Sequence, residues 1–194
     1  MNYLAHAYLS FNQEEILVGN MISDFVKGKK KYGYSTGIQE GITLHRAIDT
    51  FTDSHEATRE AKQFLKPALG LYAGAFTDIV YDHFLAIDTN EFNAANSLES
   101  FTATTYMQLE KHFIFFPERF RLMFPHMQKH NWLYNYQFNW GIEKSFGGLV
   151  RRAAYLSDAG PAFKLFEENY DALKDCYAFF FPQLKEFAKG HLKL

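Results

Sequence analysis

Two stretches of the chain carry imidazole and carboxylate side chains at helical spacing. His45 and Asp49 are four residues apart, and Asp78 and Asp82 repeat this spacing, with His83 directly after Asp82. Residues four apart lie on nearly one face of an α-helix, so each stretch presents its polar groups along one stripe. Imidazole nitrogens and carboxylate oxygens are common ligands of divalent metal ions. Facing carboxylates repel unless a cation lies between them, and the pattern therefore predicts a metal site between two helices.

Each pair has a competing interpretation. His45 and Asp49 could form an ordinary surface pair, which stabilises a helix by only a few tenths of a kcal/mol. Asp78 and Asp82 lie in the strongly apolar segment 76–85, where two carboxylates need a cation, an arginine or a shared proton. A salt bridge with Arg46 is the alternative to metal ligation there.

Further polar residues could join such a site. His83 could be a third ligand, a proton donor to a leaving group, or a buried histidine with satisfied hydrogen bonds. Asp24 ends a predicted helix, where an acidic residue is unfavourable to the helix dipole, so ligation or base catalysis would explain its position. Asp53 has a competing role as the N-cap of the next helix. His6 lies on an apolar segment and by itself fits a core histidine.

A cluster of lysines follows Asp24 and contains Lys27, Lys29, Lys30 and Lys31. It could be a solvated loop or a landing patch for an acidic partner. The whole chain has a formal net charge of −2, which argues against a nucleic-acid-binding protein.

Length and composition indicate one domain covering 1–194. A chain of 194 residues can bury a sizeable core without disulfides, and its single cysteine, Cys176, is expected to pack in that core. No signal peptide and no run of eighteen apolar residues is visible, so we expect a cytoplasmic protein without stable membrane insertion.

Helical periodicity dominates, and no alternating strand pattern stands out. The apolar and capping patterns predict helices over about 12–27, from 38 into the His45 segment, 53–64 with Asp53 as its cap, 71–85, 98–113 and 163–187, with another opening at Pro117 and ended or kinked by Pro125. The segment 132–140 has no clear period. The predicted fold is all-α, with about seven to nine helices.

Four blocks together resemble the acyl carrier protein phosphodiesterase family. They are the start Met-Asn-Tyr-Leu-Ala-His, the block Gly19 to Gly28, the block Gly41 to Asp53, and Asp78-Ile-Val-Tyr-Asp-His-Phe-Leu. The resemblance covers about the first ninety residues. It implies a fold like that of the HD phosphohydrolases and a divalent cation, with manganese the expected metal.

The resemblance also implies a reaction and a partner. The reaction is hydrolysis of the phosphodiester that joins 4′-phosphopantetheine to a serine of holo-acyl carrier protein, an acidic protein to which the lysine cluster could dock. The implied metal ligands are His6, Asp24, His45, Asp49, Asp78 and Asp82. Asp24, His83 and Arg46 are the candidate catalytic residues.

One feature departs from the HD pattern, because the chain has no adjacent His-Asp doublet. Fewer nitrogen ligands would make the site harder, which favours manganese or magnesium over zinc. Two alternatives remain: a phosphohydrolase acting on a nucleotide or other small phosphate ester, and a non-catalytic helical binding module with a structural acidic stripe.

Overall fold

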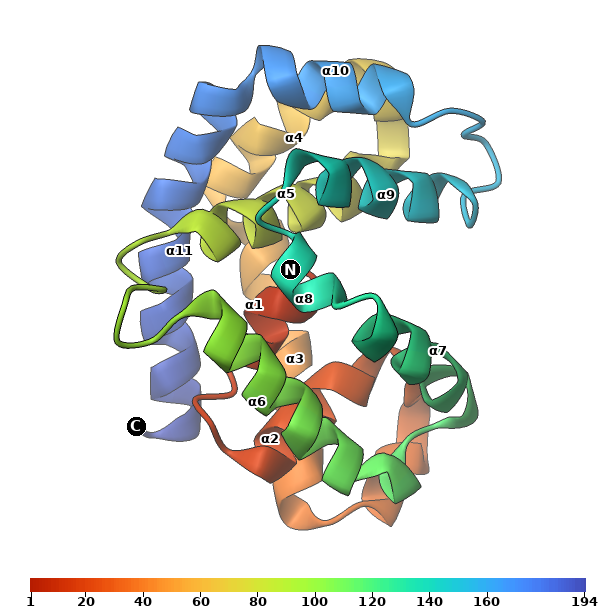
Figure 1. Ribbon diagram of the computed structural model, residues 1–194, viewed down its shortest axis with the longest axis vertical. Coiled ribbons are helices and arrows are strands. Elements are labelled where there is room, and N and C mark those ends of the chain that lie inside the picture. The colour runs from red at the N-terminus through yellow and green to blue at the C-terminus, as the bar shows by residue number, and fades with distance from the viewer.

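The computed structural model describes residues 1–194 and contains only helices, which confirms the all-α prediction (Figure 1). The α-helices are α1 (Tyr3–Tyr8), α2 (Glu14–Ile22), α3 (Thr36–Ser54), α4 (Glu56–Leu69), α5 (Ala73–Ile87), α6 (Leu98–Lys111), α7 (Glu118–Lys129), α8 (Trp132–Asn135), α9 (Asn139–Val150), α10 (Gly160–Glu168) and α11 (Tyr170–Leu192). Short 3-10 helices are η1 (Ser23–Phe25), η2 (Gly28–Gly33), η3 (Gly70–Tyr72) and η4 (Phe113–Phe115).

The count of eleven α-helices exceeds the predicted seven to nine. The predicted helix 163–187 is divided at Asn169 into α10 and α11, and the aperiodic segment around Trp132 forms the short α8 and the start of α9. Pro125 does not end its helix, because α7 continues to Lys129. Pro125 lies on the exposed face, where water can satisfy the carbonyl that a proline leaves without a donor.

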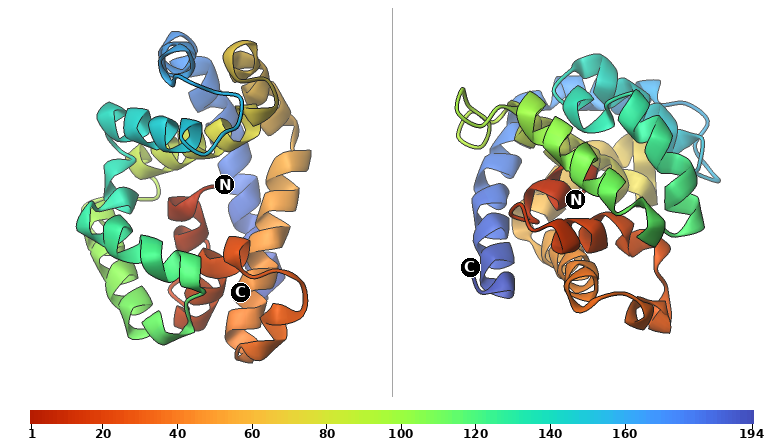
Figure 2. Two further views of the ribbon diagram at one scale, coloured as in Figure 1. Left: turned by 90° about the vertical axis from the view of Figure 1, so that its right-hand side faces the viewer. Right: turned by 60° about the horizontal axis from the view of Figure 1, so that its bottom comes forward.

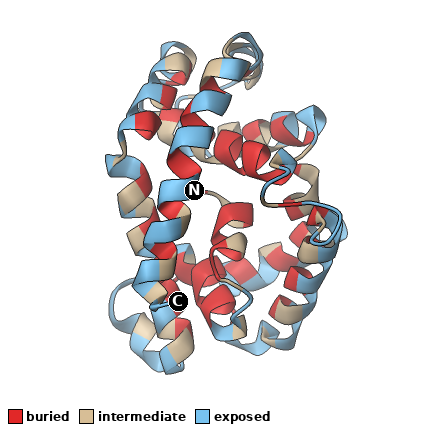
Figure 3. Cartoon of the chain, turned by 90° about the vertical axis from the view of Figure 1, so that its left-hand side faces the viewer, coloured by how far each residue is buried: buried red, intermediate tan, exposed pale blue.

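The helices surround the short N-terminal helix α1. In Figure 1, α4, α5, α9 and α10 form the upper half, α2, α6 and α7 lie in the lower half, and α11 runs along the side of both. The turned views of Figure 2 show α1 enclosed among these helices. Buried residues line the inward sides of the helices and form one apolar core (Figure 3). No helix combines the length and the apolar character needed to cross a bilayer.

Two glycines bring α2 and α3 into backbone contact. A Cβ atom at Gly19 would lie 2.1 Å from the carbonyl oxygen of Ile38, and one at Gly41 would lie 2.2 Å from that of Ile16. Because only glycine leaves room for such an approach, the pair fixes the separation of the two helices. This close packing places the backbone of α2 next to the α3 segment that contains His45 and Asp49.

The junction of α3 and α4 differs from the sequence prediction. Asp53 was expected to cap α4, but it lies inside α3 and pairs with Lys62 at 2.8 Å. The cap is His55, whose Nδ1 accepts a hydrogen bond from the backbone N–H of Ala57 at 3.2 Å. An imidazole nitrogen can accept this hydrogen bond as a carboxylate would. Because the cap is residue 55 and not residue 53, α3 extends two residues further than predicted.

Candidate metal centre

The centre begins with His45 and Asp49 on one turn of α3. The Nε2 atom of His45 lies 3.1 Å from Asp49 Oδ2, as the four-residue spacing predicts. Leu44 and Ile48 on the same helix are buried, so this part of α3 faces the interior. His45 is itself buried, whereas the side chain of Asp49 is 40% exposed.

His6 on α1 joins this pair. Its ring stacks on the ring of His45, with centroids 3.9 Å apart and planes at 13°. Its Nε2 lies 3.3 Å from Asp49 Oδ1 and is buried without a hydrogen-bond partner. One ligand atom from each of His6, His45 and Asp49 can be chosen so that all three lie within 4.8 Å of one another, close enough to hold one metal ion.

Asn20 on α2 orients both imidazoles. Its side-chain oxygen lies 2.8 Å from Nδ1 of His6, and its backbone oxygen lies 2.7 Å from Nδ1 of His45. The side-chain amide of Asn20 donates to the backbone oxygen of His6 at 2.7 Å, which fixes the orientation of the amide group. Because oxygen acceptors take the Nδ1 proton of each ring, both Nε2 atoms remain available as ligands.

The electrostatics of the cluster favour a positive charge. Burial lowers the pKa of His45, but hydrogen bonds to Asp24 and Asp49 outweigh it and raise this pKa to about 9. Burial and the neighbouring His45 lower the pKa of His6 to about 4. Burial opposes ionisation of Asp49, yet its contacts with the two imidazoles hold its pKa far below the usual range. The carboxylates of Asp24 and Asp49 thus favour a positive charge at the imidazoles, which a metal cation is suited to supply.

Asp24 completes the centre on its open side. It lies in η1, and its Oδ1 is 3.2 Å from His45 Nε2. The hydrogen bond from His45 lowers the pKa of Asp24. The side chain of Asp24 is 67% exposed, so this carboxylate connects the buried imidazoles with solvent.

Comparison with known proteins identifies the family. The profile of the acyl carrier protein phosphodiesterase family matches residues 1–184. The chain belongs to this family. Proteins named acyl carrier protein phosphodiesterase are similar along nearly their whole length. The protein from Photorhabdus laumondii subsp. laumondii is 30% identical over 190 residues, 98% of this chain and 96% of the relative. The protein from Serratia proteamaculans is 31% identical over 189 residues, 97% of this chain and 98% of the relative. No solved structure matches the chain.

In this family member, Asp78 reaches the centre through the chain terminus. The amino group of Met1 is buried, and its nitrogen lies 3.1 Å from Asp78 Oδ1 and 3.5 Å from Asp49 Oδ1. The ammonium thus compensates two carboxylates from different helices. The structure brings Asp78 next to the cluster, with Met1 between the aspartates.

Asp82, predicted as a ligand, is not among the residues that converge at the cluster. Its Oδ2 accepts a hydrogen bond from the backbone N–H of Leu4 at 2.7 Å, and its Oδ1 accepts from Asn2 and Ala5, both at 3.3 Å. Burial raises the pKa of Asp82 to about 7, against the effect of the Met1 ammonium and these amides. Asp82 therefore anchors the start of α1, which carries His6.

The structure does not bring His83 to the centre either. Its Nδ1 donates to the backbone oxygen of Tyr136 at 2.7 Å, and its Nε2 lies 2.9 Å from the hydroxyl of Tyr170. Burial lowers the pKa of His83. Both ring nitrogens therefore have hydrogen-bond partners within the protein. Of the three roles that the sequence allowed for His83, the structure fits the buried histidine with satisfied hydrogen bonds.

Arg46 and the lysine cluster lie at the surface. Arg46 donates to the backbone oxygen of Val26 at 2.8 Å and ties α3 to the segment after η1. Lys27, Lys29 and Lys30 are exposed beside or within η2. Lys31 is half-buried, with its ammonium 5.3 Å from the ring centre of Tyr32.

Two groups of the centre, Asn20 and the amino group of Met1, are not among the residues predicted from the sequence. Asn20 is fully buried in the otherwise apolar segment 16–22 of α2, and a polar residue in such a segment signals a structural hydrogen-bond role. No residue pattern reveals the Met1 amine, because its position depends on how Asp82 holds α1.

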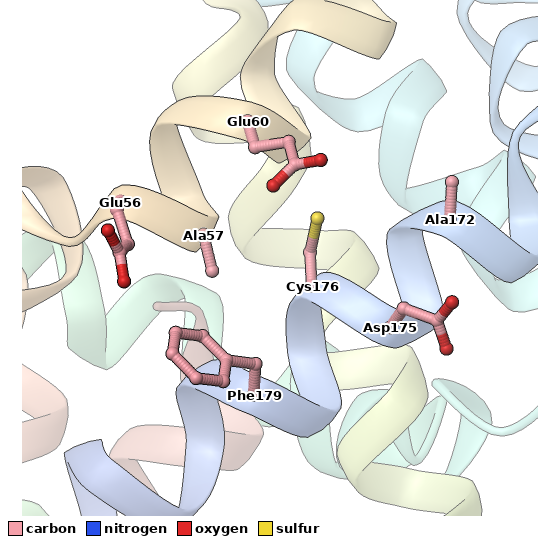
Figure 4. Close-up of a pocket in the computed structure, with 7 residues that line it drawn as sticks. All are labelled: Glu56, Ala57, Glu60, Ala172, Asp175, Cys176 and Phe179. Atoms are coloured by element: carbon pink, nitrogen blue, oxygen red, sulfur yellow. The ribbon is translucent and has the colours of Figure 1, made fainter.

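A separate pocket lies between α4 and α11 (Figure 4). Glu56, Glu60 and Asp175 line it together with Cys176, whose sulfur points between the two helices. Burial raises the pKa of the Cys176 thiol to about 11, so the thiolate that nucleophilic chemistry needs is scarce at neutral pH. Cys176 is buried, as predicted, and the pocket lacks the paired histidines of the centre.

Proposed function

We propose that this protein is a metal-dependent hydrolase that removes 4′-phosphopantetheine from holo-acyl carrier protein and leaves the apo form. The observation that carries the proposal is the convergence of His6, His45 and Asp49 within 4.8 Å in a chain that matches the phosphodiesterase family over residues 1–184. Two imidazole nitrogens and a carboxylate from two helices are a donor set for a divalent cation.

The residues fit such a cation. The buried Nε2 of His6 has no hydrogen-bond partner, which is costly unless another group satisfies it. The Nδ1 contacts with Asn20 aim the Nε2 lone pairs of both rings toward Asp49. Asp24 adds a second carboxylate at the exposed side. His6, His45, Asp49 and Asp24 are therefore the residues that would hold the metal.

We further propose manganese as the metal. Carboxylate oxygens suit magnesium and manganese, whereas imidazole nitrogens disfavour magnesium relative to later divalent metals. Manganese accepts both kinds of donor. Magnesium remains the second choice, and comparison of the two ions in the assay below tests this order.

Hydrolysis of a phosphodiester needs a nucleophilic water, stabilisation of the negative charge on the non-bridging phosphoryl oxygens and a stabilised leaving oxygen. When bound, a divalent cation acts as a Lewis acid on a phosphoryl oxygen and lowers the pKa of water. Asp24 is the residue best placed to orient the water and accept its proton, because it is exposed and only its Oδ1 is hydrogen-bonded to the protein. Arg46 uses one donor on Val26 and keeps others for an anionic group.

The test is incubation with purified holo-acyl carrier protein and Mn²⁺, followed by intact-mass spectrometry of the carrier. We expect loss of one phosphopantetheine group, and its suppression by a chelator. Asp49→Asn and His6→Ala should each lower turnover at least about 100-fold, since they remove ligands of the catalytic site. The matched control is Asp53→Asn, one turn further along α3, where the carboxylate is exposed and pairs with Lys62.

Two outcomes would contradict the proposal. If Asp49→Asn kept full activity, the proposed metal centre could not be required for the reaction. An intact carrier protein, together with metal-dependent cleavage of a small phosphate ester, would favour the alternative phosphohydrolase activity. We also propose a single domain 1–194, which the one continuous core supports, and a cytoplasmic location, which the single unpaired cysteine supports. The proposed HD-like relationship rests on the resemblance of the four sequence blocks.

A further inference from the structure

Large apolar side chains are exposed on one short part of the chain, η4 and the start of α7. Ile114 is 76% exposed and Leu122 is 69% exposed, and Phe113 and Phe115 are also exposed. Single exposed apolar residues are ordinary, but four within ten residues of a folded segment are typical of an interaction surface.

This segment is held rigidly. Arg121 donates to the backbone oxygens of Ile114 at 3.2 Å and of Phe116 at 3.0 Å, and so ties η4 to α7. Beneath them, the buried rings of Phe116 and Phe120 pack edge to face with centroids 4.7 Å apart. A fixed apolar surface loses little conformational entropy when a partner binds.

The segment also lies beside the candidate centre. Phe120 contacts Phe25, with ring centroids 5.5 Å apart, and Phe25 directly follows Asp24. The hydroxyl of Tyr3 on α1 lies 3.8 Å from the sulfur of Met123 on α7. Both views of Figure 2 show η1 next to α7. The inner side of the segment therefore packs against the elements that carry Asp24 and His6.

The charge of this region differs from that of the whole protein. Residues 26–36 and 113–124 contain six lysines and arginines and one acidic residue, Glu118, although the whole chain has 20 basic and 22 acidic residues. The excess positive charge complements an acidic protein. A second copy of the chain is a poorer fit, because a symmetric dimer through this region would place like charges against each other.

We propose that Lys29, Lys30, Ile114, Phe115, Arg121 and Leu122 form a basic–apolar surface that docks the folded, acidic carrier protein. The proposal rests on the proposed function and extends it, because it adds η4 and α7 to the lysine cluster. The apolar side chains supply affinity, and the basic ones supply steering and orientation.

The test measures carrier-protein binding by calorimetry and turnover by mass spectrometry on the same variants. Ile114→Ser with Leu122→Ser should weaken binding and raise KM about tenfold, with kcat unchanged at saturation. The matched control is Leu71→Ser in η3, which removes an even more exposed leucine in the other half of the molecule. Lys29→Glu with Lys30→Glu should also raise KM and flatten its dependence on salt.

Results of three kinds would separate the possibilities. Unchanged binding and KM in both double variants would overturn the docking surface. The proposal would also be overturned if the wild type dimerised, or bound anionic vesicles, and the apolar double variant abolished that association without changing KM. Wild-type binding that both double variants weaken, without any release of phosphopantetheine, would support the surface and reject the proposed function.

Discussion

The imidazole rings of His6 and His45 stack face to face, 3.9 Å between centroids, although 39 positions separate them in the chain. Both Nδ1 atoms contact Asn20, one through its side chain and the other through its backbone. A single residue of α2 therefore sets the ring orientation of two residues from α1 and α3. The arrangement makes Asn20 a positioning residue for the proposed metal site.

Asn20→Leu should weaken Mn²⁺ binding about 10–100-fold, the usual effect of losing a hydrogen bond to a ligating histidine. Calorimetric titration of the purified variant measures this. Asn169→Leu, which removes a half-buried asparagine between α10 and α11, is the control and should bind Mn²⁺ as the wild type does. Equal affinity in the two variants would contradict the role of Asn20.

Gly41→Ala should destabilise the protein by about 1–3 kcal/mol or more, because the added methyl group meets the Ile16 backbone oxygen at 2.2 Å. Gly190→Ala on α11 is the matched control. A Cβ added at Gly190 would meet no atom within 4 Å, so this substitution should leave the free energy of unfolding unchanged or raise it by up to about 1 kcal/mol. Urea unfolding gives both values. A Gly41→Ala protein as stable as the wild type would show that α2 and α3 can separate freely.

His83 should make folding sensitive to acid. Burial lowers its pKa in the folded state, so below the ordinary histidine pKa of about 6.5 the unfolded chain takes up a proton that the folded protein resists. The contribution of His83 to stability is present above that pH and is lost as the pH falls. His83→Gln should therefore show a smaller decrease in unfolding free energy between pH 7.5 and 5.5 than the wild type.

The measurement is urea unfolding at several pH values, with His130→Gln as the control. His130 is exposed, and its replacement should leave the wild-type pH slope. A His83→Gln slope equal to the wild-type slope would mean that the hydrogen bonds to Tyr136 and Tyr170 tolerate the charged ring.

Extending the chain before Met1 should lower its melting temperature. The Met1 nitrogen is buried 3.1 Å from Asp78 and 3.5 Å from Asp49, and an added Gly-Ser pair would replace the ammonium with a neutral amide. Two carboxylates would then lose their compensating charge. The same pair added after Leu194, which is exposed, is the control. Scanning calorimetry without metal compares the two, and equal melting temperatures would contradict the role of the ammonium.

Local patterns were enough for the all-α fold and for the His45–Asp49 pair. Both depend only on the periodicity of a single helix, which can be read from the spacing of residues along the sequence. The same period placed Asp78 and Asp82 on one face of α5, but it could not say what that face would meet. Asp82 meets the backbone amides of α1 and holds that helix in place, whereas Asp78 meets the Met1 ammonium.

The remaining members of the centre depend on packing between helices. Residue types alone made His6 a core histidine, and the family resemblance favoured it as a site residue. For Asp24, its position at a helix end had already suggested ligation or base catalysis, and the resemblance strengthened this. Their meeting with His45 follows from the anchoring of α1 by Asp82 and from the glycine contact between α2 and α3. Sequence spacing determines distances within one helix, because the backbone geometry is regular there. Distances between helices are set by side-chain volumes and buried hydrogen bonds across the whole core, so only the tertiary structure decided which polar groups converge.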